Sequence, residues 1–119
     1  MNRSADCIGL FTLFATAAGG KGQAVASGYR PQHMLHANYQ SSGLHEYEGT
    51  QLLGPGESAI AKVWFITPEV YPACLWSGRA VSVLEGSRVV GTLQVREVLN
   101  PILRCEPSAF VTKWVAPRV

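Results

Sequence analysis

The sequence predicts an all-β fold, a small closed or nearly closed antiparallel β-barrel of about six strands. Its 119 residues include 12 glycines and 7 prolines, spread at short intervals that leave little room for a helix. Between them lie short segments rich in valine, isoleucine, phenylalanine, tryptophan and threonine, the residues that favour strands. Strands separated regularly by turn residues are typical of sandwiches and barrels. The length fits a single domain, 1–119.

Short runs of β-branched and aromatic residues, bounded by turn residues, predict five strands. In the run before Pro68, large side chains lie on both sides, so this strand is expected to be covered on both faces, with Trp64 in the core. LEGSRV at 84–89 predicts a hairpin, because Gly86 can supply the positive φ that a tight reversal needs. The predicted strands are 7–16, 32–39, 58–67, 79–84 and 88–99.

The last predicted strand alternates apolar and polar residues, and an extension, 100–119, follows it. The Asn-Pro pair at 100–101 ends this strand, and residues 109–115 alternate again, which predicts an added edge strand. Such a strand would cover one face of the barrel or pair with a second copy of the chain. In the strand itself, the residues expected to face the core are Val89, Leu93, Val95 and Leu99.

Charge and cysteine content limit the classes of protein. Only 15% of the residues are charged, below the usual proportion of about a quarter, so an exposed apolar face is expected. A net charge of +2 does not by itself predict a nucleic-acid surface. Cys7, Cys74 and Cys105 form no CxxC pair, which predicts free thiols in a reducing compartment, the cytoplasm. No apolar run approaches the length of about 18 residues that spans a membrane, and 7–16 is interpreted as a strand rather than a signal peptide.

Three histidines close together in the sequence raise the question of a metal site. His33, His36 and His45 share one stretch with Glu46 and Glu48. Their spacing matches none of the usual zinc patterns, and no cysteine joins them. We therefore expect solvated strand and loop residues here, with neither a metal nor another cofactor.

Several turn motifs follow one another in a fixed order. They are a glycine-rich turn at 19–22, GYRPQ at 28–32, PGES at 55–58, Pro68, and EGSRVVG at 85–91. In this order they resemble the C-terminal β-barrel domain of bacterial translation elongation factor Tu, over about residues 5–99. The chain departs from that domain by an insertion around 70–78 and by the extension 100–119, and the other two domains of the factor are absent.

The resemblance implies roles for GYRPQ and for the hairpin. In the factor, residues matching Arg30, Glu85 and Gly86 lie on the face that meets the T-stem of aminoacyl-tRNA. A guanidinium and a glycine amide can both bind phosphate oxygens. Alternatively, Tyr29 and Arg30 lock the barrel entrance by pairing with the backbone or with a carboxylate such as Glu85, and we expect this structural role. GGKGQ at 19–23 lacks the spacing of a phosphate loop, so we expect no GTP binding.

Protein binding is the function that we expect from this chain. The factor's barrel packs against its GTPase domain and meets protein partners, which implies an apolar surface. Large amphipathic side chains, with Tyr71 and Phe110 among them, favour interfaces. We therefore expect a non-catalytic binding module, a translation-related regulator or decoy, with homodimerisation through an apolar face or edge strand as an option. The predicted partner-binding residues are Tyr29, Arg30, Glu85, Gly86, Trp76 and Trp114.

Three other functions are considered. An immunity-type protein would neutralise a toxin by imitating the factor's surface. An enzyme is least favoured, because the chain has no GxSxG elbow and a single aspartate, Asp6, although Cys74 beside His33 or His36 is left open as a catalytic pair. Binding of tRNA or other RNA would need basic residues on one track, the candidates being Lys21, Arg30, Arg79, Arg88 and Arg96.

Overall fold

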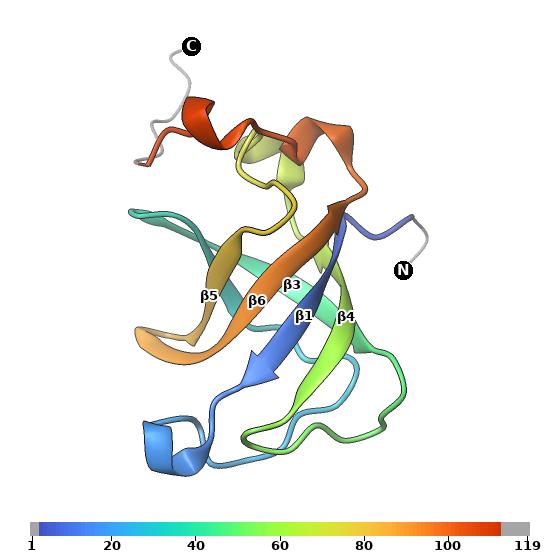
Figure 1. Ribbon diagram of the computed structural model, residues 1–119, viewed down its shortest axis with the longest axis vertical. Coiled ribbons are helices and arrows are strands. Elements are labelled where there is room, and N and C mark those ends of the chain that lie inside the picture. Colours follow the sequence, from blue (N-terminus) through green and yellow to red (C-terminus); the bar gives the residue numbers. More distant parts are fainter. Residues whose placement is uncertain (1–2, 113–119) are drawn as a thin grey trace.

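The computed structural model describes residues 3–112 and places six antiparallel strands in a closed barrel (Figure 1). The order around the barrel is β1-β4-β3-β2-β5-β6, and pairing of β6 with β1 closes it. The predicted fold class is therefore confirmed. The strands are β1 (Cys7–Leu13), β2 (Gln32–His36), β3 (Tyr39–Tyr47), β4 (Ser58–Phe65), β5 (Ala80–Glu85) and β6 (Arg88–Val98). Short 3-10 turns follow as η1 (Thr16–Ala18), η2 (Pro68–Val70), η3 (Pro101–Leu103) and η4 (Pro107–Ala109).

Every second residue of a strand fills the inside of the barrel. In β1 the buried positions alternate with partly exposed ones along the whole strand, as the two-residue period of a strand requires. Phe11, Phe65 and Leu93 are almost completely buried in one core cluster. Trp64, on the outer side of β4, is also buried, and its indole N–H donates to the Arg3 carbonyl at 2.7 Å. The prediction that Trp64 is a buried core residue is confirmed.

The third strand is missing from the sequence-based prediction, which ran one strand across residues 32–39. The structure turns at 37–38 and continues as β3, paired with both β2 and β4. The inward positions of β3 are Ser41, Gly43, His45 and Tyr47. These residues are small or polar, so the alternation is present but is not hydrophobic, and the pattern gives no strand signal.

Two bulges in β6 correct the predicted inward face. Leu93 and Val95 point inward as expected, but Val89 is 41% exposed and Leu99 is only half-buried. Val90 is an extra residue opposite β5, and Arg96 is an extra residue opposite β1. Each extra residue reverses the alternation beyond it. The buried positions at the two ends of β6 are therefore Val90 and Val98.

Residues 66–79 and 99–112 cover one end of the barrel, here called the helical end (Figure 1). Leu75 and Arg104 form a parallel bridge there, and the Tyr71 and Leu103 side chains are fully buried in the barrel core. The added edge strand predicted at 109–115 is wrong for its described part, 109–112, which begins at the end of η4 and contains no strand. A closed barrel offers no free edge with which such a strand could pair.

Asp6 ties the start of β1 to the helical end. Its carboxylate accepts hydrogen bonds from Arg3 at 2.7 and 3.0 Å, from the Phe65 backbone N–H at 2.7 Å and from the Asn100 side chain at 2.9 Å. The Asp6 side chain is completely buried. The carboxylate therefore joins three segments that are far apart in the sequence. Within 3–112, no helix is long and apolar enough to cross a membrane.

Candidate functional site

The GYRPQ tyrosine lies at the hairpin end of the barrel, formed by residues 14–22 and the β5–β6 turn. Gly28 has a φ of 101°, and its N–H donates to the His45 carbonyl at 2.8 Å, which fixes the strand entrance beside β3. The Tyr29 ring packs against Phe11, with ring centroids 6.5 Å apart, and edge-on against His45 at 5.9 Å. The ring is therefore held by the core while its hydroxyl points toward β5.

The Glu85 carboxylate accepts a hydrogen bond from that hydroxyl. Tyr29 Oη donates to Glu85 Oε2 at 2.6 Å, and Lys21 Nζ lies 3.0 Å from the same oxygen. The lysine also lies over the Tyr29 ring, 5.2 Å from its centroid. The hydrogen bond from Tyr29 and the charge of Lys21 lower the pKa of Glu85, although partial burial opposes them. Lys21, Tyr29 and Glu85, here called the Tyr29 cluster, are thus mutually satisfied, as expected for a structural lock.

The β5–β6 turn completes the hairpin end. Gly86 has a φ of 61°, and Gly86 and Ser87 are the only residues between the two strands, so the left-handed first position suits a type II′ turn. The Arg88 guanidinium donates to the carbonyls of Gly19 and Gly20. The predicted hairpin is confirmed, and its arginine fastens it to the glycine-rich turn at 19–22.

Arg30 is exposed and faces a different surface from Tyr29. It lines a hollow of about 130 Å³ together with Arg3, Trp64 and Ile66. Ile66 is 69% exposed. Within residues 3–112 no carboxylate pairs with Arg30, so the lock that we expected at the barrel entrance is made by Tyr29 without the arginine.

The five basic residues considered for an RNA-binding track do not lie together on the barrel. Lys21 and Arg88 bind groups of the hairpin end. Arg79 precedes the first residue of β5 and Glu85 is its last, so Arg79 lies at the opposite end of that strand. The Arg79 guanidinium is engaged with backbone carbonyls. These positions do not support a single basic track.

The histidines are not solvated, which corrects the sequence-based expectation. His33 and His45 are completely buried, and His36 is 4% exposed. His33 and His45 occupy inward positions of β2 and β3, so the strand geometry draws these two rings inside. His36 lies outside this alternation, after an irregularity in β2, and its ring stacks on Phe110. No group of three metal-ligating side chains occurs in the part of the chain that the structure describes.

Arg79 organises the helical end. Its guanidinium donates to the Leu35 carbonyl at 2.7 Å, to the Met34 carbonyl at 3.4 Å and to the Cys74 carbonyl. The face of the same group covers the Trp76 ring at 5.2 Å and the Phe110 ring at 4.5 Å. Burial lowers the pKa of Arg79, and the aromatic faces and carbonyls supply the partial negative charge around it. One cation thus joins β2, the 70–78 segment and the C-terminal segment.

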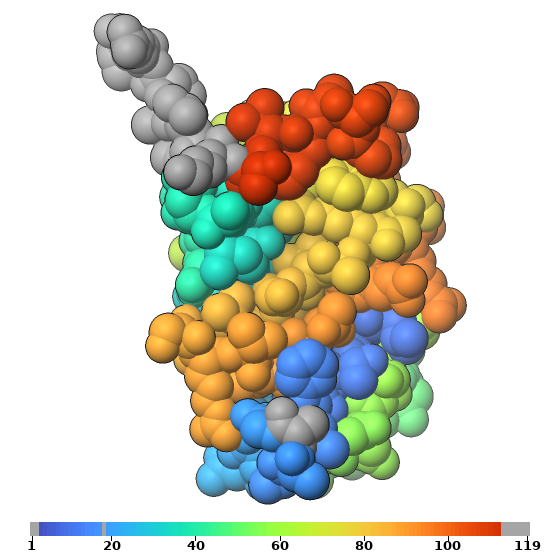
Figure 2. Space-filling view, turned by 60° about the vertical axis from the view of Figure 1, so that its left-hand side comes forward, coloured from blue at the N-terminus to red at the C-terminus, as the bar shows by residue number. Residues whose placement is uncertain are grey.

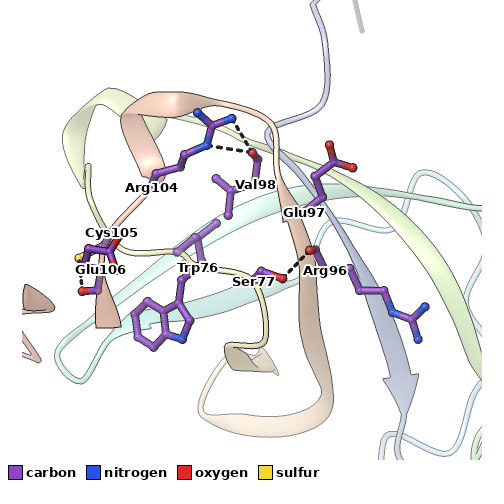
Figure 3. Close-up of a pocket in the computed structure, with 9 residues that line it drawn as sticks. Trp76, Ser77, Arg96, Glu97, Val98, Arg104, Cys105 and Glu106 are labelled. Carbon is purple, nitrogen blue, oxygen red and sulfur yellow. Dashed lines mark hydrogen bonds between the residues drawn. The ribbon is translucent and has the colours of Figure 1, made fainter. Parts of the chain in front are cut away.

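A groove of about 460 Å³, here called the Trp76 groove, opens beside Trp76, whose ring contacts Arg79 (Figure 3). Its floor is apolar, made by Leu75, Val98 and the Trp76 indole, and its rim carries charged residues of β6 and of 104–106. Ser77 Oγ donates to the Arg96 carbonyl at 2.8 Å, and Arg104 donates to the Val98 carbonyl at 3.1 and 3.3 Å. The Arg96 side chain points away from Trp76 (Figure 3). These hydrogen bonds hold the residues of the groove walls in place. The apolar floor lies between them.

No family model matches this chain. The six predicted binding residues fall into separate places: Tyr29, Glu85 and Gly86 at the hairpin end, Arg30 on the β3–β4 side, and Trp76 at the helical end. Trp114 lies outside the described residues. The organising role of Arg79 is not visible in the sequence, because its partners Leu35 and Phe110 are distant in the chain.

Proposed function

We propose that this chain is a non-catalytic protein-binding module whose partner docks at the Trp76 groove. The observation that carries the proposal is the groove itself, with a partly exposed tryptophan on an apolar floor and charged groups on the rim. Interfaces combine an apolar centre containing aromatic anchors with a polar rim. Glu97 and Glu106 are exposed on that rim. Arg96 and Arg104 line the same groove and are also exposed, so a partner with an apolar side chain and flanking groups of both charges fits this pattern.

The resemblance to the C-terminal domain of elongation factor Tu supports a finer proposal. A barrel of that kind would act in translation, as a regulator or decoy in the cytoplasm. The Trp76 groove is built from the segments by which this chain departs from the factor, 70–78 and 100–106, together with β6. The partner would therefore be particular to this chain rather than shared with the factor.

RNA binding is the second candidate, and one observation favours it. Arg30 is exposed and has no paired carboxylate within the described residues, so its guanidinium is available for a phosphate. The Tyr29 cluster weakens this candidate, because Glu85 is already engaged with Tyr29 and Lys21.

Affinity capture with two arginine variants tests both candidates. Glu97→Arg reverses a charge on the groove rim, and Gln94→Arg introduces the same side chain at an exposed β6 position outside the groove. We expect a protein partner to be captured by the wild type and by Q94R but lost from E97R. Equal capture by both variants would contradict the assignment of the groove. Co-purification of tRNA that Arg30→Ala abolishes would support the RNA candidate instead.

A further inference from the structure

Phe110 occupies a slot made by three side chains of the body, His36, Trp76 and Arg79, here called the Phe110 slot. The His36 ring stacks on Phe110 with centroids 5.1 Å apart, and Trp76 meets it edge-on at 5.3 Å. Arg79 lies over the same ring at 4.5 Å. Figure 2 shows the C-terminal segment in red at the upper end, against the yellow 70–80 segment and the teal strands. The aromatic ring is thus held from three sides.

The body also binds the backbone that follows Phe110. His36 Nδ1 donates to the Val111 carbonyl at 2.8 Å, and the Ala37 N–H donates to the Thr112 carbonyl at 2.8 Å. Phe110 itself is extended, with φ −70° and ψ 130°. A side-chain pocket next to main-chain hydrogen bonds is how many proteins recognise an extended peptide. The slot and the adjacent backbone therefore contact one aromatic ring and the carbonyls of the two residues that follow it.

The chain's own segment fills this site incompletely. Because Nδ1 of His36 donates to a carbonyl, Nε2 of the neutral ring is an acceptor, and within the described residues it is buried without a hydrogen-bond partner. Every residue of 106–112 except Phe110 is exposed, with Val111 62% exposed. Among the contacts of the described residues, the segment is therefore held by one ring and two hydrogen bonds, and Nε2 of His36 remains an unused acceptor.

We propose that the Phe110 slot is a recognition site for an extended, phenylalanine-bearing segment of a partner protein, which displaces the chain's own residues 110–112. This inference rests on the proposed protein-binding function and names the chemistry of the partner. A segment that also places an N–H or O–H donor at His36 Nε2 gains a hydrogen bond that the chain's own segment lacks. The tethered segment competes at an effective concentration of about millimolar, so a free peptide binds well only when Phe110 is removed.

The test uses the full chain and a fluorescent peptide with the sequence PSAFVT of residues 107–112. By anisotropy, we expect Phe110→Ala to bind this peptide roughly tenfold or more tightly than the wild type, because the slot is empty. Val111→Ala is the matched control, since this exposed side chain leaves the ring in place, and its affinity should equal that of the wild type. A peptide with alanine for phenylalanine should not bind, and F110A/H36A should lose the binding.

Three results obtained with F110A would overturn the inference, as would two results of the capture experiment. The first is no saturable binding by folded F110A, with folding checked by thermal unfolding. The second is binding that is indifferent to the peptide's phenylalanine. The third is a wild-type dimer that F110A dissociates, which would make a second copy the occupant. If E97R loses a captured partner while F110A/H36A retains it, the slot is wrong and the Trp76 groove stands. If both retain it, both assignments fail.

Discussion

His33 and His45 face each other inside the barrel with their Nε2 atoms 2.8 Å apart. His33 Nδ1 lies 3.1 Å from the Ser41 carbonyl, which can only accept, so this nitrogen carries the proton. In the neutral ring, His33 Nε2 must then accept from His45 Nε2–H. His45 Nδ1 in turn accepts from the Tyr47 hydroxyl at 2.8 Å. The chain of hydrogen bonds fixes both tautomers and runs from Tyr47 to Ser41.

The first prediction concerns these tautomers. We expect His33 to be protonated at Nδ1 only and His45 at Nε2 only at pH 7, because any other neutral arrangement leaves two acceptors or two donors facing each other. Long-range nitrogen–proton correlation spectra of the imidazole rings distinguish the two forms directly. Identical tautomers in both rings would contradict the hydrogen-bond chain.

The second prediction concerns acid stability. Burial lowers the pKa of His33 to about 4, and burial together with the charge of His33 lowers the pKa of His45 well below its usual range. The unfolded chain binds these protons near pH 6.5, so stability is complete above that pH and falls as the pH drops toward 4. With two such histidines, the free energy of unfolding should fall with a slope approaching about 2.7 kcal/mol per pH unit between pH 6 and 5. Urea unfolding at a series of pH values measures it.

A double variant provides the control for this slope. His33→Leu with His45→Phe replaces both titrating rings by apolar side chains, so its free energy of unfolding should change little over the same pH range. If this variant does not fold, the wild-type imidazole resonances give the same information, because they should not titrate while the protein remains folded. Titration of both rings near pH 6.5 in the folded state would contradict the prediction.

The sequence predicts those features of the fold that depend on residues close together in the chain. Gly86 marks the β5–β6 turn because a positive φ is a local requirement. The strand β3 could not be predicted from the sequence, because its inward-facing residues are chosen for contacts with residues that are distant in the chain. A Cβ on Gly43 would lie 2.7 Å from His33 Cε1, so the glycine is there to admit a ring from β2. Phe110 meets His36 and Arg79 only in the folded chain. No periodicity or spacing indicates such a meeting.

The third prediction is that Asp6→Ala destabilises the protein by about 3 kcal/mol, the lower part of the range for breaking a buried ion pair, because the Arg3 side chain is 41% exposed. The change also leaves the Phe65 N–H without its side-chain acceptor. Glu97→Ala removes a carboxylate from an exposed position and should cost within about 0.5 kcal/mol. Chemical denaturation of the two variants measures the difference, and equal costs would contradict the role given to Asp6.

The fourth prediction tests whether the GYRPQ tyrosine is structural. Tyr29→Phe keeps the ring against Phe11 and removes only the hydroxyl that donates to Glu85. We expect a loss of about 1 kcal/mol, because the Glu85 side chain is 39% exposed and water replaces part of the lost hydrogen bond. The same change should raise the pKa of Glu85 toward its usual value, since the tyrosine is the largest cause of its lowering.

Carboxyl resonances of Glu85 followed against pH report that rise, and urea unfolding reports the loss of stability. The depressed folded pKa stabilises the protein above the unfolded value, and this contribution disappears as the pH falls, so wild type and Y29F should converge in acid. Arg30→Ala is the matched control, because Arg30 is exposed and pairs with no carboxylate within 3–112, and it should leave both measurements unchanged. A larger loss in R30A than in Y29F would place the lock on the arginine and contradict the Tyr29 cluster.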